Sequence, residues 1–129
     1  MKIDFIESGS PDCPLLRIYG NEPGSAALLI SVFDQLASGH TNEVAIHSLP
    51  DIESVNGCKL FARLHHEDIG IRKCSEKNTL ECLLSSESWT RISGLLEPFT
   101  EPKADVRYQW LDETSDISLL ISSSEYGEW

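Results

Sequence analysis

The residues best suited to chemistry lie in one short segment, LHHEDIGIR, at positions 64–72. It places two histidines and two carboxylates in a row, namely His65, His66, Glu67 and Asp68. Imidazole and carboxylate groups serve as metal ligands and as general acids or bases, so this run is the candidate metal or acid–base site. The alternative is a solvated strand end or a hairpin connection, because polar residues gather at turns.

The spacing of these four residues favours the turn. On a strand, His65 and Glu67 would share one face while His66 and Asp68 share the other, so at most two would reach one ion. Zinc sites use three or four protein ligands, and His40, His47 or a cysteine would have to complete the set. The order H-H-E-D also differs from the helical motif H-E-x-x-H. No cofactor is therefore expected.

Other catalytic motifs are absent from the sequence. The loop GNEPGSA at 20–26 has no lysine after its second glycine, and Glu22 would repel a phosphate. There is no G-x-S-x-G elbow for a nucleophilic serine. Among the four cysteines, Cys74 has the most basic neighbours, Arg72 and Lys73, and is the best thiol candidate. The sequence leaves enzymatic activity open but indicates none.

Alternating and helical apolar patterns predict the elements that would position these residues. Strands are expected at 14–20, 43–49, 58–66, 69–74, 79–85, 106–112 and 117–122, and amphipathic helices at 21–39 and 85–99. Strands 58–66, 69–74 and 79–85 have short connections, which favours a meander. We therefore expect an α+β fold: an antiparallel sheet, made of a meander plus a C-terminal hairpin, with two helices packed on it.

Length and composition favour one domain spanning residues 1–129, because a chain of this length can bury one sizeable core. The cysteines form no C-x-x-C pair and are expected to be reduced thiols. Asp4 and Glu7 interrupt any apolar stretch at the N-terminus, so the segment does not fit a secretory signal peptide. The longest apolar run, AALLI, is far shorter than the roughly 20 residues that a membrane-spanning helix needs. A cytoplasmic protein without a membrane anchor is the expectation.

The net charge of −11 is unevenly distributed along the chain. Residues 1–56 carry −6, residues 57–96 carry +1, and residues 97–129 carry −6. A negative field repels nucleic acid and anionic membranes, and it accelerates encounter with a basic protein. The alternative is that the negative charge only keeps the protein soluble and attracts no particular partner.

Aromatic side chains lie among the acids of the last third of the chain. Tyrosine and tryptophan often anchor interfaces, and surrounding carboxylates would steer a basic partner. We therefore predict a partner-binding surface formed by Tyr108, Trp110, Asp112, Glu113, Asp116, Tyr126, Glu128 and Trp129. The alternative is that Tyr108 and Trp110 share the core face of a strand.

One cationic feature interrupts this acidity. Lys59, Arg63, Arg72 and Lys73 lie on the predicted strands 58–66 and 69–74, with Phe61 between the first two. Such a row would receive an acidic segment or an anionic ligand, although an ordinary solvated sheet face has the same pattern. The sequence does not identify a ligand.

In size, charge and expected architecture, the chain resembles small bacterial proteins of the immunity type, which bind and neutralise a basic enzyme or toxin. The resemblance rests on no residue motif, so it transfers no site residue. The leading hypothesis is a non-enzymatic protein-binding module or inhibitor that occludes a basic partner. A small metal-dependent enzyme or sensor using His65–Asp68, and a structural or oligomerising domain, are the alternatives. A monomer and a homodimer are both compatible with the sequence.

Overall fold

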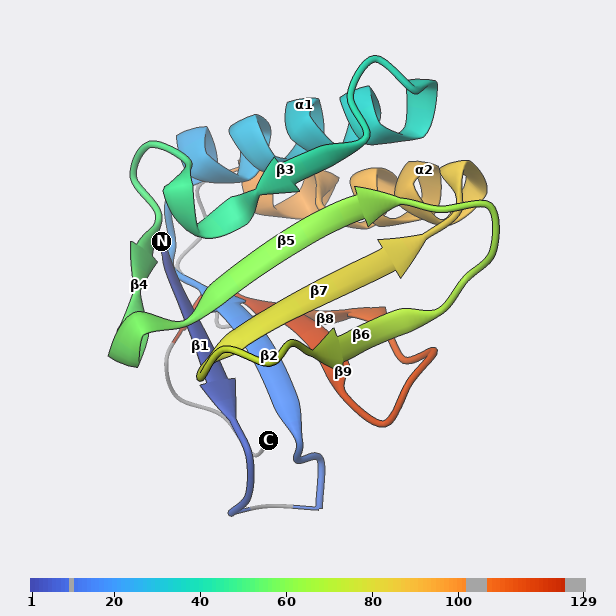
Figure 1. Cartoon of the computed structure of the whole chain (residues 1–129). Coiled ribbons are helices and arrows are strands. Elements are labelled where there is room, and N and C mark those ends of the chain that lie inside the picture. The colour runs from blue at the N-terminus through green and yellow to red at the C-terminus, as the bar shows by residue number, and fades with distance from the viewer. Residues whose placement is uncertain (10, 102–106, 125–129) are drawn as a thin grey trace.

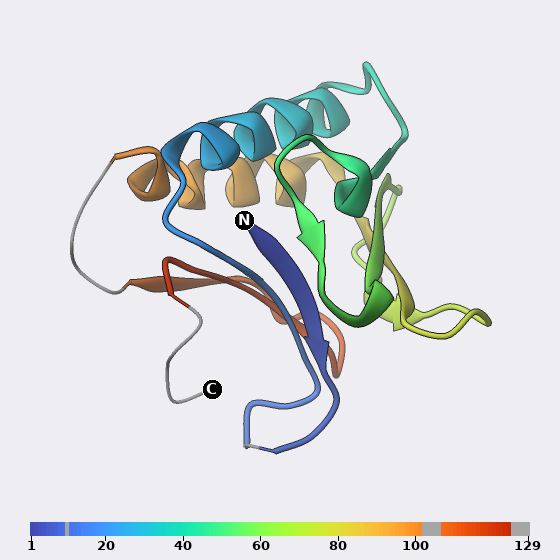
Figure 2. The ribbon, with the colours of Figure 1, turned by 90° about the vertical axis from the view of Figure 1, so that its left-hand side faces the viewer.

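The computed structural model describes residues 1–9, 11–101 and 107–124, which form two helices and two β-sheets around a shared core (Figure 1). The helices lie side by side, and Figure 2 shows them on one side with the N-terminal strands below. Short 3-10 turns lie at Ile46–Ser48, Val55–Gly57 and Glu97–Thr100. The α+β prediction and its two helices are confirmed.

Local signals explain where the two helices begin and end. Helix α1 (Pro23–Ser38) has proline in its first turn, and Gly39 closes it with a left-handed φ of 79°. Helix α2 (Ser86–Leu95) is capped by Ser85, whose hydroxyl accepts a hydrogen bond from the Ser88 backbone N–H at 3.3 Å. The helices pack together through Phe33 and Trp89, whose rings stack with centroids 5.1 Å apart.

The first sheet has five strands in the order β4-β1-β2-β9-β8. These are β4 (Glu53–Ser54), β1 (Lys2–Ile6), β2 (Leu15–Tyr19), β9 (Ser118–Ser122) and β8 (Tyr108–Asp112). The sheet is mixed, because β2 runs parallel to β9 and β1 runs parallel to β4. Ile18 and Ile121 are fully buried on the face that lines the core.

The second sheet has four strands in the order β3-β5-β7-β6. They are β3 (Glu43–Ala45), β5 (Lys59–Leu64), β7 (Thr79–Leu84) and β6 (Gly70–Lys73). All six residues of β7 are buried, as expected for a central strand with neighbours on both sides. Leu60, Ala62 and Leu80 face the shared core, so the other face of this sheet carries the alternate side chains.

The predicted purely antiparallel meander is wrong. Strands β5 and β7 are parallel neighbours, and the loop after β5 passes the end of β7 to reach β6 on its far side. The hairpins β6–β7 and β8–β9 do form as antiparallel pairs. A connection of five residues allows either arrangement, and the burial of both faces of β7 favours the central position. Strand β1 was not predicted, although its Ile3 is fully buried.

The two sheets meet where the β8–β9 loop crosses the edge of β6. Ile71 and Ile117 form an isolated antiparallel bridge. The Ser115 hydroxyl donates to the Ile71 carbonyl at 2.6 Å and accepts from the Ile71 N–H at 3.1 Å. This contact fixes the loop that carries Glu113 and Asp116 against strand β6.

Within the described ranges, neither helix combines the length and the apolar character needed to cross a membrane.

Candidate partner-binding surfaces

The four residues of the candidate metal site lie in the loop between β5 and β6. Strand β5 ends at Leu64, and the exposed side chains of His66 and Glu67 approach each other only loosely, with Nε2 and Oε1 3.9 Å apart. His65 turns back on its own loop, where Nδ1 accepts from the Glu67 N–H at 3.1 Å. These contacts are typical of a polar connection.

Asp68 has a structural contact at the start of helix α2. Its Oδ1 accepts the Ser85 backbone N–H at 2.8 Å, and this bond is the main reason that the pKa of Asp68 lies below its usual value. A shallow depression nearby is lined by Asn42, Leu64, His65, His66, Ser85, Ser86 and Glu87. Among the residues that the structure describes, no three His, Cys, Asp or Glu side chains are grouped closely enough to hold a metal ion.

The other residues considered for chemistry have structural partners or unfavourable surroundings. His47 Nδ1 accepts the Leu60 N–H at 3.0 Å, and its ring lies edge-on to Phe61 at 5.1 Å. Burial raises the pKa of Cys74, which works against formation of the reactive thiolate despite the nearby cations. Burial raises the pKa of Cys58 to about 12. Neither thiol is activated by its surroundings.

The β5–β6 loop and the β8–β9 loop, both acidic, adjoin at one side of the molecule. We call this surface the acidic edge; it consists of Glu67, Asp68 and Ile69 from the first loop and Glu113 and Asp116 from the second. The β8–β9 loop lies so close to Gly70 that a Cβ atom there would be 2.9 Å from the Ser115 nitrogen. The four carboxylates are exposed. Ile69, which follows Glu67 and Asp68 in the first loop, is 37% exposed; among the described residues, only Tyr108 is a more exposed large apolar side chain.

The structure divides the predicted C-terminal surface into parts. Glu113 and Asp116 are exposed on the acidic edge. Asp112 is only 3% exposed, and its Oδ1 accepts from the Thr114 hydroxyl at 2.6 Å. Tyr126, Glu128 and Trp129 lie outside the described residues.

The two aromatic residues of strand β8 differ in exposure. Tyr108 is 56% exposed, whereas Trp110 is half-buried opposite Leu120. Both lie at the edge of the five-stranded sheet, on the face opposite Ile121 and the shared core. Tyr108 and Trp110 therefore share one face of strand β8, but it is not the face that lines the shared core, contrary to the alternative interpretation of the sequence.

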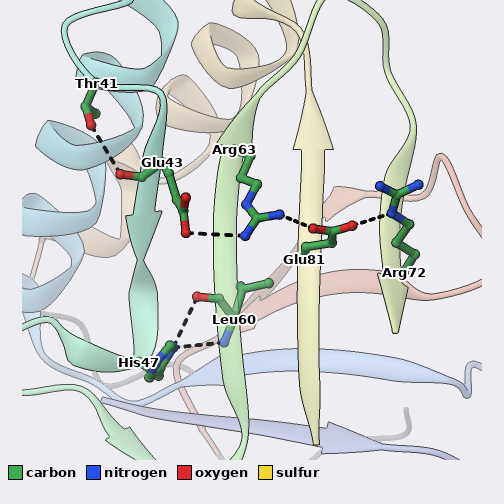
Figure 3. A network of polar contacts seen from close by, with 7 residues as sticks. All are labelled: Thr41, Glu43, His47, Leu60, Arg63, Arg72 and Glu81. Atoms are coloured by element: carbon green, nitrogen blue, oxygen red, sulfur yellow. Dashed lines mark hydrogen bonds and ion pairs between the residues drawn. The ribbon is translucent and has the colours of Figure 1, made fainter. Parts of the chain in front are cut away.

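We call the other surface the cationic face: Lys59, Phe61, Arg63 and Arg72 around Glu81, with Glu43 at the margin. Figure 3 shows Glu43, Arg63, Glu81 and Arg72 of this face. Glu81 is only 7% exposed, and its two carboxylate oxygens accept from Arg63 Nη1 and Arg72 Nε. Arg63 Nη2 also lies 3.4 Å from Glu43 Oε1. One nearly buried carboxylate thus orients two arginines on this sheet face.

Lys73 does not belong to the cationic face. Alternation along β6 places it on the side opposite Arg72, where its Nζ lies 2.5 Å from Glu7 Oε1 and 5.4 Å from the centre of the Phe5 ring. The ion pair lowers the pKa of Glu7. The sequence row of four cations is therefore divided between two sides of the sheet.

Sequence reasoning missed two residues of these surfaces. Glu81 was treated only as a strand residue, although its position between Leu80 and Cys82 places it on the face opposite these apolar side chains. Ile69 was assigned to a strand, whereas β6 begins at Gly70. The positive φ of 89° at Gly70 marks the boundary between the loop and the strand.

Comparisons with known proteins do not place the chain in a family, since no family model, no curated protein and no solved structure matches it.

Proposed function

We propose that this protein is a non-enzymatic protein-binding module that uses its acidic edge to occlude a basic partner. The observation that carries the proposal is the exposed Ile69, which follows Glu67 and Asp68 in the β5–β6 loop. The end of this loop lies against the acidic β8–β9 loop, through the close approach of Gly70 to Ser115 and the hydrogen bonds between Ser115 and Ile71. An exposed apolar side chain near charged residues matches the usual arrangement of an interface anchor and its polar rim.

The charges of the acidic edge are available to a partner. Glu113 and Asp116 are exposed, and neither carboxylate makes a hydrogen bond or an ion pair in the described part of the chain. With the net charge of −11, they would attract a cationic surface and increase the association rate. Their positions are fixed by the contact of their loop with β6, so little ordering is required on binding.

Tyr108 extends the same proposal to the edge strand β8. Its exposed ring offers apolar area with a polar hydroxyl, a combination that is common in interfaces. An inhibitor of the immunity type would use these groups to cover the cationic cleft of its target.

The experiment is affinity capture from native lysate with three tagged baits, followed by mass spectrometry at low and high salt. The baits are the wild type, the double variant Glu113→Gln/Asp116→Asn, and the control Glu53→Gln/Glu76→Gln, which removes the same charge elsewhere. We expect one basic protein with the wild type and the control, its loss with the acidic-edge variant, and its release by salt. Equal capture by all three baits would refute the proposal.

A further inference from the structure

We infer that the cationic face is a second, separate docking surface, and that it receives an acidic segment of another protein. This goes beyond the proposed function, because it involves the opposite charge and a different part of the fold. It rests on three features of the four-stranded sheet: an uncovered face, pre-positioned arginines and a surplus of positive charge.

No described helix or strand packs over this face, although its central side chains on β7, Thr79, Glu81 and Leu83, are buried. Leu60, Ala62 and Leu80 point to the core that the helices share, so Lys59, Phe61 and the arginines point the other way. Figure 1 shows this sheet in front, with both helices beyond its upper edge and the five-stranded sheet behind it. A sheet face rich in arginine and aromatic area is typical of an interface.

The arginines are held in place before any partner arrives. Arg63 is bound to Glu81 and Glu43, and its guanidinium lies 5.6 Å from the centre of the Phe61 ring. Arg72 is bound to Glu81 through Nε, and its side chain is 59% exposed. Fixed side chains lose little conformational entropy when a partner binds.

The free edge of Arg72 determines the chemistry of the occupant. In Figure 3 its two terminal nitrogens point away from Glu81, and neither donates a hydrogen bond within the described residues. These two nitrogens form a planar fork that matches the two oxygens of a carboxylate. The charges along this face alternate in the order Glu43, Arg63, Glu81, Arg72. A partner carboxylate bound to Arg72 would continue this alternation.

The charge balance of the face favours the same occupant. Lys59, Arg63 and Arg72 contribute three positive charges, and Glu43 and Glu81 contribute two negative ones, which leaves one positive charge. Both carboxylates are engaged by arginine, so the groups open to a partner are cationic. A short acidic segment fits this patch, whereas an extended polyanion would meet the net charge of −11 around it.

The test is an amide chemical-shift titration of the full chain with a short synthetic peptide of Glu, Asp and Tyr. The control peptide replaces each acid with its amide. We expect shifts centred on β5, β6 and β7 with the acidic peptide only. Arg72→Gln should weaken the affinity roughly tenfold, because it removes a charge-assisted bidentate contact. Arg72→Lys should also weaken it, since lysine keeps the charge but not the fork.

The matched control is Lys77→Gln, which removes an exposed cation from the β6–β7 turn and should leave the affinity unchanged. Thermal melting of each variant separates lost binding from lost folding. The inference fails if the peptide causes no shifts at millimolar concentration, if shifts lie elsewhere, or if Arg72→Gln binds as tightly as wild type. If inorganic phosphate or single-stranded DNA binds equally well at this face, the face is a general anion site and the inference of an acidic protein segment is wrong. None of these outcomes depends on Glu113 or Asp116, so the two proposals can fail separately.

Discussion

The acidic edge and the cationic face use charge in opposite ways. On the cationic face, the nearly buried Glu81 neutralises and orients Arg63 and Arg72. On the acidic edge, Glu113 and Asp116 are exposed on a loop that is fixed by its backbone and by Ser115. The cationic face should select its partner by the geometry of short-range hydrogen bonds. The acidic edge should attract a partner over a longer range, with little dependence on the partner's exact geometry. Substitutions should therefore affect the two surfaces differently.

The largest expected effect concerns the support beneath the cationic face. Trp89 is 1% exposed, stacks on Phe33, and donates its indole N–H to the Arg63 carbonyl at 3.1 Å. Trp89→Ala should lower the free energy of unfolding by about 3–5 kcal/mol, because it leaves a cavity and an unmade hydrogen bond. Urea denaturation measures this. The half-buried Trp110 of edge strand β8 is the control, and Trp110→Ala should lower the free energy of unfolding clearly less. If both variants lower it equally, burial beneath the cationic face does not make Trp89 more important for stability than Trp110.

The next effect tests the point where the two regions meet. Gly70 has a φ of 89°, and an added Cβ would be 2.9 Å from the Ser115 nitrogen. Gly70→Ala should cost about 2–3 kcal/mol through backbone strain and displacement of the acidic loop. Gly94→Ala is the control, since nothing lies within 4 Å of that added Cβ in helix α2, and it should stabilise by about 0.5–1 kcal/mol. Thermal unfolding of both variants distinguishes a local steric effect from a general one.

A smaller effect sharpens the charge comparison itself. Glu81→Gln removes the carboxylate shared by two arginines and should cost about 1–2 kcal/mol, a value reduced because both arginines are partly exposed. Glu43→Gln, at an exposed position on the same face, should cost less than about 0.5 kcal/mol. If the two variants are equally stable in urea, Glu81 does not organise the face.

The smallest effect is the pH dependence that Asp68 contributes. Its pKa is lowered in the folded protein, so its contribution is present above the unfolded value and is lost as the pH falls through the folded value. Asp68→Asn should therefore lose less stability than wild type between about pH 5 and pH 3. Parallel pH titrations of the melting temperature would contradict this assignment.

Much of the fold was predictable, because local periodicity marks individual elements. The stripe of Leu29, Phe33 and Leu36 and the Ser85 cap define the helices, and alternation defines most strands. The pairing was not predictable, since the choice between an antiparallel neighbour and a parallel one for β5 depends on burial of both faces of β7. Periodicity within one strand does not contain that information.

The surfaces were predictable only in part, for the same reason. Glu113 and Asp116 are recognisable as a polar turn, but their contact with Gly70 joins segments distant in the sequence. The cations of β5 and β6 are visible in the sequence. Their link through Glu81 appears only when β7 is placed between those strands.

The most direct test of the proposed function is the association rate of the purified chain with its captured partner, measured by stopped flow over a range of ionic strength. The proposal predicts a rate that falls steeply with salt, and a weaker dependence for Glu113→Gln/Asp116→Asn than for Glu53→Gln/Glu76→Gln. Association that is insensitive to salt, or equally sensitive in both double variants, would contradict the role of the acidic edge.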